Sequence, residues 1–212
     1  MLLHSLFILG ICVEAITGAI AAGRKKMDFF GVMLIACIAA LGGGTVRDAL
    51  FNTYPLTWVS HPEYLLYTSG FAFLTIFIAH RLVRITKLFL ILDALGLATF
   101  AIAGTQKILD TGFSPSLAII GGMLTGICGG MLRDILCNDI PLVLRKEVYA
   151  VIALAGSLLF IILDHFAIAR EINTLIAILA IFIARLLAIF FHIEIPQFDY
   201  SASLQKNRRK KD

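Results

Sequence analysis

The sequence predicts an all-α integral membrane protein with seven transmembrane helices, arranged as an inverted repeat of three plus three helices followed by a seventh. Three observations predict this fold class. The chain of 212 residues is 59% hydrophobic and only 15% charged, which is too apolar for an ordinary soluble domain. Its charged residues separate apolar stretches of roughly 20 residues, about the length that a helix needs to cross a bilayer. Finally, the segment GGGTVRDALFNTYPL (Gly42–Leu56) recurs as CGGMLRDILCNDIPL (Cys128–Leu142).

Seven apolar stretches are candidate spans: Leu2–Ala22, Asp28–Leu50, Pro62–Val83, Leu88–Ile108, Pro115–Cys137, Val148–His165 and Ile172–Phe191. The first has the length of a signal peptide, but it lacks a basic start and carries Glu14, so we interpret it as a retained span. The four cysteines lie within or at the ends of spans, without metal-ligand spacing. We expect them to pack in the membrane without disulfides.

The basic residues predict the orientation of the chain in the membrane. Together, the tail and the linkers after the first, third and fifth stretches contain 13 lysines and arginines. The opposite linkers contain two, Lys107 and Arg170. Basic linkers stay in the cytoplasm, so the C-terminus is predicted to be cytoplasmic and the N-terminus outside. Contact with anionic membrane lipid then explains the basic tail, and no nucleic acid is required as a partner.

The repeat extends through both halves of the chain at a constant offset of 86 residues. Because each copy holds three spans, the second copy must insert upside down relative to the first. We therefore expect a first repeat at 1–85, an inverted second repeat at 86–170, a seventh helix at 171–192 and a basic cytoplasmic tail at 193–212. Inversion would place one Arg-Asp pair towards each mouth of an hourglass-shaped path, with the glycines near its centre.

The glycines of the two repeated segments are the first candidate site, and they allow two interpretations. Small residues let membrane helices pack closely. Neighbouring glycines also loosen a helix and free backbone carbonyls, which can replace water around a dehydrated monovalent cation. We favour a pore-lining break in the second and fifth helices, with six pore residues: Gly42, Gly43, Gly44, Cys128, Gly129 and Gly130.

The two Arg-Asp pairs, Arg47–Asp48 and Arg133–Asp134, are candidate gating or structural charges. Neighbours in sequence do not face each other on a regular helix, so we expect separate partners for the arginine and the aspartate. Those partners would lie in the other repeat or among lipid head groups. Both arginines could also reach the membrane surface from helix ends.

Three further charged residues lie within or at the ends of spans. Asp93 opens the fourth span, either as an interfacial anchor or as part of the pore. Lys107 lies one turn after Gly104 and could hold a carbonyl, repel cations or respond to voltage. Glu14, which has Phe100 as its repeat counterpart, is either a paired or neutralised carboxylate or a pore residue that attracts cations.

Motifs for catalysis are missing from the sequence. It contains no Walker loop, HExxH motif, nucleophile elbow or CxxC pair. We therefore expect neither an enzyme nor a resident cofactor or metal.

Longer runs of sequence resemble a known family. LDALGLATFAIAGTQKIL (Leu92–Leu109), LTGICGGMLRDIL (Leu124–Leu136) and PLVLRKEVYA (Pro141–Ala150) are similar to the second repeat of the prokaryotic trimeric intracellular cation (TRIC) channel family. AITGAIAAGRKKMDFFGV (Ala15–Val32) with ALGGGTVRD (Ala40–Asp48) resembles its first repeat. The resemblance implies a homotrimer in a bacterial or archaeal cytoplasmic (inner) membrane, with a path in each protomer for potassium and other monovalent cations.

The resemblance also implies roles for individual residues. The family's lysine in the fourth helix maps onto Lys107, and its Lys-Glu before the sixth helix maps onto Lys146 and Glu147. Two residues depart from the expected pattern. Phe7 stands where the repeat partner has an aspartate, and Glu14 occupies a position expected to be apolar.

Two other functions compete with a channel. The same type of domain is also described as a glycine transporter, and a secondary transporter could hold the carboxylate and amine of a small amino acid at the ends of broken helices. Alternatively, the chain is a membrane scaffold whose repeat is only structural.

Overall fold

The computed structural model describes residues 2–82, 86–145 and 148–193, and these parts of the chain are all-helical. They contain seven helices of 17 to 25 residues and two short elements. In chain order these are α1 (Leu2–Arg24), α2 (Phe29–Leu50), α3 (Thr57–Ser60), α4 (Glu63–Leu82), α5 (Thr86–Asp110), α6 (Pro115–Leu136), the 3₁₀ turn η1 (Leu142–Leu144), α7 (Tyr149–His165) and α8 (Arg170–Phe190).

Most of the long helices have the length and composition of membrane spans. Within the described residues, α1, α2, α5, α6 and α8 are long and apolar enough to cross a membrane, with mean hydropathies of 1.5 to 2.4. Helices α4 and α7 contribute shorter apolar segments, Glu63–Ile78 and Tyr149–His165. The predicted fold class, an all-helical membrane protein, is therefore confirmed.

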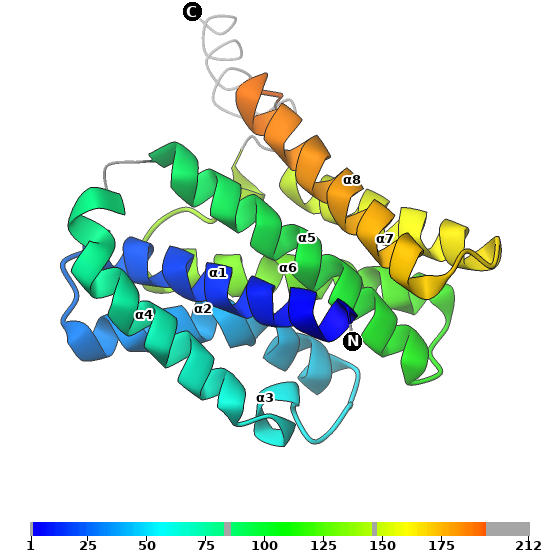
Figure 1. The fold of residues 1–212 in the computed structure, drawn as a ribbon, viewed down its shortest axis with the longest axis horizontal. Helices are drawn as coiled ribbons and strands as arrows, with labels where there is room; N and C mark the ends of the chain where they lie inside the picture. The colour runs from blue at the N-terminus through cyan, green and yellow to red at the C-terminus, as the bar shows by residue number, and fades with distance from the viewer. Residues whose placement is uncertain (1, 83–85, 146–147, 194–212) are drawn as a thin grey trace, which may run out of the picture.

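Four helices form the centre of the molecule. Helix α1 packs against α5 and runs in the opposite direction, and α2 packs in the same way against α6 (Figure 1). Helix α4 covers α1 and α2, whereas α7 and α8 cover α5 and α6. Alanines such as Ala15, Ala36 and Ala98 are fully buried between these helices, because small side chains let membrane helices approach closely.

Matching local structures end α2 and α6. Asn52 and Asn138 follow the two helices with φ angles of 53° and 54°, in the left-handed region that asparagine tolerates better than most residues. In each case the next amide donates a hydrogen bond of 2.9 Å to a carbonyl oxygen, that of Asp48 or of Asp134. This closes the helix end and explains why asparagine recurs in both repeated segments.

The side chains of the same two aspartates accept hydrogen bonds from the first residues of the short elements that follow. An Asp48 carboxylate oxygen accepts a hydrogen bond of 2.8 Å from the amide of Thr57, the first residue of α3. An Asp134 carboxylate oxygen likewise accepts one of 3.0 Å from the amide of Leu142, the first residue of η1. Each aspartate thus satisfies a free N–H group at a helix start and fixes the chain over one end of the bundle.

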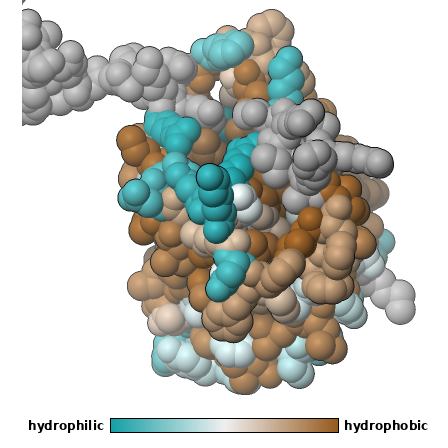
Figure 2. Space-filling model, turned by 90° about the vertical axis from the view of Figure 1, so that its left-hand side faces the viewer, coloured by the Kyte–Doolittle hydropathy of each residue, from teal (hydrophilic) through white to brown (hydrophobic). Residues whose placement is uncertain are grey.

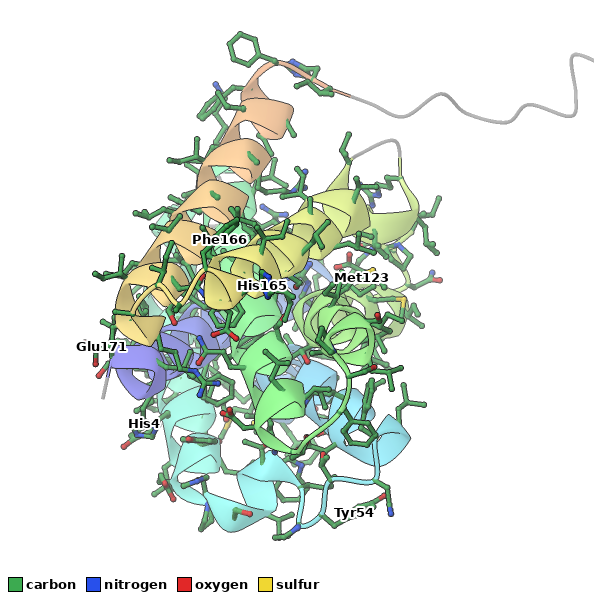
Figure 3. All side chains as sticks on the ribbon, turned by 90° about the vertical axis from the view of Figure 1, so that its right-hand side faces the viewer. His4, Tyr54, Met123, His165, Phe166 and Glu171 are labelled. Atoms are coloured by element: carbon green, nitrogen blue, oxygen red, sulfur yellow. The ribbon has the colours of Figure 1, made fainter. Side chains whose placement is uncertain are left out.

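The outside of the bundle is strongly apolar, as expected for a surface that contacts lipid. Large side chains such as Phe30, Leu66, Phe77 and Phe166 are between 70% and 75% exposed. Hydrophilic residues gather at the end where α1 stops at Arg24, here named the Arg24 end (Figure 2). The opposite face of the bundle, which Figure 3 views, is here named the Lys107 end.

Candidate functional site

The glycines of the repeated segments lie where α2 crosses α6. Both helices run without interruption through the glycines, so the predicted helix breaks are wrong. A Cβ atom on Gly43 would overlap the carbonyl oxygen of Thr125, and one on Gly129 would overlap that of Ala39. The glycines therefore allow two regular backbones to touch. In a membrane this arrangement keeps every carbonyl paired within its own helix, whereas a break would leave carbonyls to be satisfied elsewhere.

The other predicted pore residues on these helices have different surroundings. A Cβ on Gly44 or Gly130 would lie 3.6 or 3.4 Å from the guanidinium of the arginine three residues later. These two glycines thus leave room for the arginine side chains. Gly42 packs against α6, and Cys128 is buried.

One group of charges, here named the Asp48 cluster, consists of Arg47, Asp48, Thr57 and Lys107 at the Lys107 end. Arg47 Nη2 lies 2.7 Å from the Asp48 carboxylate, and Lys107 Nζ lies 3.2 Å from it. The Thr57 hydroxyl donates to Asp48 at 2.6 Å and accepts from both cations. A single buried carboxylate thus holds two cations, which leaves a formal charge of plus one on the three charged groups.

A second group, here named the Arg133 cluster, consists of Glu14, Thr17, Asp93, Arg133 and Asp134. The Arg133 guanidinium contacts Asp134 at 2.9 Å, Asp93 at 3.0 Å and Glu14 at 3.4 Å. The Thr17 hydroxyl donates to Glu14 at 2.7 Å and accepts from Arg133 at 3.0 Å. Three carboxyl groups surround one guanidinium. If all three are ionised, the formal charge is minus two, opposite in sign to that of the Asp48 cluster.

These contacts correct in part the expectation that neighbouring arginine and aspartate have separate partners, because each pair also contacts a charged residue of the other repeat, Lys107 or Glu14. Arg47 pairs with Asp48, and Arg133 pairs with Asp134. Each arginine side chain is long enough to fold back along the helix, so that its Nε atom reaches the next residue at 2.9 Å. Both arginines are buried inside the protein, at 1% and 0% exposure, and do not extend to the membrane surface.

Asp93, Lys107 and Glu14 all contact other charged groups in the structure. Asp93 is a buried partner of Arg133, not an interfacial anchor, and Lys107 holds a carboxylate and a hydroxyl instead of a carbonyl. Glu14 is a paired carboxylate within the Arg133 cluster. Gly96 makes room for it, because a Cβ there would overlap the Glu14 side chain.

The Arg133 cluster contains two buried polar atoms without a hydrogen-bond partner among the described residues, one oxygen of Asp93 and Arg133 Nη2. Buried groups of this kind are usually satisfied by water or an ion. In the part of the chain that the structure describes, no group of three histidine, cysteine, aspartate or glutamate side chains has the arrangement of a metal site.

Aromatic residues stand at the repeat counterparts of two of these carboxylates, one in each repeat. Glu14 and Asp93 have Phe100 and Phe7 as their counterparts at the repeat offset. The two phenylalanine rings lie 5.5 Å apart, and Phe7 also contacts Tyr64 at 5.5 Å. The two carboxylates of the Arg133 cluster thus correspond to a pair of aromatic rings towards the Lys107 end.

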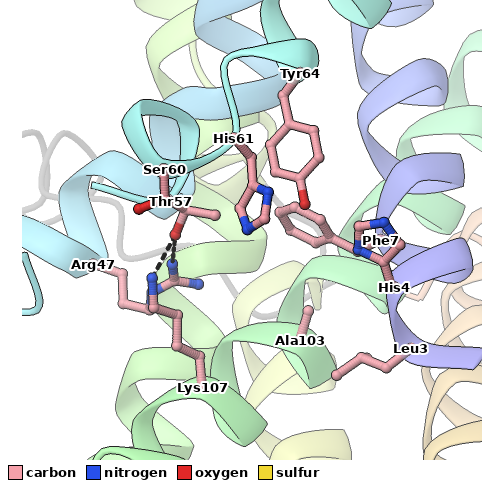
Figure 4. A pocket seen from close by; sticks show the side chains of 10 residues that line it. All are labelled: Leu3, His4, Phe7, Arg47, Thr57, Ser60, His61, Tyr64, Ala103 and Lys107. Atoms are coloured by element: carbon pink, nitrogen blue, oxygen red, sulfur yellow. Dashed lines mark hydrogen bonds between the residues drawn. The ribbon is translucent and has the colours of Figure 1, made fainter. Parts of the chain in front are cut away.

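A cavity of about 340 Å³ opens at the Lys107 end (Figure 4). Its ten lining residues come from α1, the end of α2, the α3 region, α4 and α5, and they include the side chains of Arg47, Thr57 and Lys107. They are Leu3, His4, Phe7, Arg47, Thr57, Ser60, His61, Tyr64, Ala103 and Lys107. An adjoining space of only about 10 Å³ shares Phe7 with it and reaches Phe100. That volume is near the minimum for one water molecule.

Sequence reasoning missed several polar and aromatic residues of this site. Thr17 and Thr57 each link charged partners, and Tyr64 lines the cavity. Hydroxyl residues inside apolar stretches could have been considered, since buried hydroxyls need partners, but their contacts join helices far apart in sequence. Lys146 and Glu147, which the family resemblance singled out, lie outside the described residues.

Comparison with known proteins gives consistent matches over most of the chain. A family model described as Glycine transporter matches residues 4–80 and 90–165. The inner membrane protein YadS of Escherichia coli is 35% identical over 200 residues, which cover 93% of this chain and 97% of YadS. A membrane protein of Vibrio cholerae is 36% identical over 198 residues, covering 93% of this chain and 83% of that protein.

Solved structures show the same fold. The TRIC trimeric intracellular cation channel orthologue from Rhodobacter sphaeroides matches with a TM-score of 0.87 at 37% identity, over 90% of this chain and 98% of that one. A second structure, from work on the structural basis for conductance through TRIC cation channels, matches with a TM-score of 0.84 at 31% identity. The match covers 92% of this chain and 97% of that one.

Proposed function

Because this chain belongs to the prokaryotic TRIC channel family, we propose that it is a cation channel that conducts potassium and other monovalent cations passively through a path inside each protomer. The proteins with the matching structures are described as TRIC cation channels, one of them as trimeric. We extend both properties to this chain, as a homotrimer in the bacterial inner membrane, the location named for YadS.

The observation that carries the proposal is the placement of two charged clusters at opposite ends of one helix crossing. The Asp48 cluster borders the open cavity at the Lys107 end. The Arg133 cluster is buried towards the Arg24 end, and among the described residues one Asp93 oxygen there has no partner and could accept from water or bind a cation. Intramembrane charge is costly and usually marks a functional path, and here both clusters lie within a single protomer.

A cation would pass between α1, α2, α5 and α6. From the Lys107 end it would enter the cavity, pass the Phe7 and Phe100 rings, and reach the hydroxyls and carboxylates of the Arg133 cluster. Side-chain oxygens would then replace water around the ion. In this mechanism Gly43 and Gly129 hold the two helices together and supply no free carbonyls.

For membrane topology, we propose that α4 and α7 also span, which gives seven spans with the N-terminus outside. The basic end of the bundle, with Arg24, Lys25 and Lys26, is then cytoplasmic. At 17 residues α7 is roughly 26 Å long, slightly less than the hydrocarbon thickness, a mismatch that local thinning of the bilayer accommodates.

Reconstitution into planar bilayers under asymmetric KCl tests the proposed function. A channel gives discrete current steps with a reversal potential near that of potassium. Saturable glycine uptake by proteoliposomes that show no current steps would overturn the proposal and favour the transporter. Absence of both activities from folded protein would favour a scaffold.

A further inference from the structure

We propose that Phe89 is the barrier that closes the ion path at the Arg24 end, and that the surface residue Arg24 holds it shut. This inference rests on the proposed function for the path itself. The phenylalanine ring is almost fully buried, with 8% exposure, and it contacts two guanidinium groups. The Cζ atom of Arg133 lies 4.7 Å from the ring centroid, and that of Arg24 lies 5.0 Å from it.

Two guanidinium groups with different surroundings contact the ring. Arg133 is fully buried within its cluster, whereas Arg24 is exposed at the end of α1. The Phe89 ring therefore separates the buried carboxylates from the solvent at the Arg24 end.

Helix α5 places the ring directly over the cluster. Phe89 and Asp93 are four residues apart on α5, so they lie on the same face of the helix one turn from each other. Asp93 pairs with Arg133 at 3.0 Å, and the same guanidinium contacts the ring. A cation leaving Asp93 towards the Arg24 end must displace Phe89, which first has to lose its contacts with both arginines.

The corresponding positions at the Lys107 end, which is open to a cavity, provide a comparison. Leu3 is the counterpart of Phe89, and it lines the cavity of about 340 Å³ at the Lys107 end. Asp110 is the counterpart of Arg24, and it pairs with Arg170 of α8 at 2.6 Å. The open end thus has an aliphatic side chain and no guanidinium clamp, while the closed end has both the ring and the clamp.

Chemical accessibility tests the barrier without requiring conduction. Thr17→Cys places a thiol in the Arg133 cluster, in a background whose four native cysteines are replaced by serine or alanine. A small cationic thiol reagent is added from the Arg24 end. Phe89→Leu, which installs the residue of the open end, removes two cation–π contacts and should raise the labelling rate about tenfold. Phe89→Ala should do the same, and Phe30→Leu, on an exposed phenylalanine of α2, is the matched control.

Single-channel recording tests the clamp. Arg24→Gln removes one exposed cation–π contact and should raise the open probability about two- to fivefold, with unitary conductance unchanged. Lys25→Gln is the matched control, because Lys25 is the next residue but pairs with Asp139 at 2.8 Å. Arg24→Lys keeps a cation beside the ring and should restore most of the closure.

The two measurements separate this inference from the proposed function. Faster labelling in the Phe89 variants, without current in either the wild type or those variants, supports the barrier and contradicts the channel. Wild-type currents, together with unchanged labelling and open probability in folded Phe89 and Arg24 variants, overturn the inference while the channel stands.

Discussion

At the scale of single residues, the same Arg-Asp dipeptide is used in two opposite ways. Asp48 is the only carboxylate in contact with Arg47 and Lys107 among the described residues. Arg133, in contrast, is shared by three carboxylates. The first site therefore depends on its aspartate, whereas the second depends on its arginine.

This difference predicts unequal effects of matched substitutions. Asp48→Asn leaves two cations without a counter-charge, one of them buried, and should lower the free energy of unfolding by about 3–5 kcal/mol. Asp134→Asn should cost only about 1–2 kcal/mol, because Arg133 keeps Asp93 and the new amide oxygen can still accept from Leu142. Thermal unfolding of the detergent-solubilised protein measures both. Equal losses, or a larger loss for Asp134→Asn, would contradict this account.

Sequence alone identified these charges but not their partners. Buried arginine and aspartate need counter-charges, so the repeated dipeptides were recognisable as a site. The rule that helix neighbours do not face each other failed for Arg47, because it describes where side chains start and ignores the reach of a long one. Phe89 was not predictable, since its two arginine contacts bridge 65 and 44 residues of sequence.

At the scale of helices, the crossing of α2 and α6 organises the path. The sequence predicted both helices, the repeat that relates them and the glycines at their centre. It did not decide between a break and a close contact, because both use neighbouring glycines. The uninterrupted helices favour close contact, since each backbone group then keeps its partner within its own helix.

Glycine substitutions should therefore act through packing. Gly43→Ala places a methyl group against a backbone carbonyl of α6, which cannot move aside as a side chain can, and should cost about 2–3 kcal/mol. Gly44→Ala finds only ordinary contact with a guanidinium, and Gly70→Ala meets no atom within 4 Å. Both controls should remain close to the wild type in expression and thermal unfolding. A stable Gly43→Ala protein with altered conductance would instead revive the idea of a helix break that lines the pore.

At the scale of the whole molecule, the path has a built-in electrical asymmetry. Its Lys107 end carries a formal plus one on the Asp48 cluster, and its Arg24 end carries minus two on the Arg133 cluster. The inverted repeat by itself would make the two ends alike. Two differences between the repeats break the symmetry: Glu14 and Asp93 correspond to Phe100 and Phe7, and Lys107 corresponds to Ala21.

This asymmetry predicts rectification. With the Arg133 cluster on the cytoplasmic side, cations accumulate near its carboxylates and are repelled at the outer cavity. In symmetric KCl, outward potassium current should then exceed inward current at equal and opposite voltages. Raising the KCl concentration should weaken the effect only in part, because salt screens buried charges less than exposed ones.

Glu14→Gln tests the source of the rectification. The amide keeps the size and the Thr17 hydrogen bond of Glu14 while the formal charge of the Arg133 cluster changes from minus two to minus one. The ratio of outward to inward current should fall towards one, with little change in thermal stability because Arg133 retains its two closer carboxylates. Glu171→Gln, which removes an exposed carboxylate on α8, is the control and should leave the ratio unchanged. An unaltered ratio in folded Glu14→Gln channels would show that Glu14 contributes no charge to the local cation concentration, and would contradict this source of the rectification.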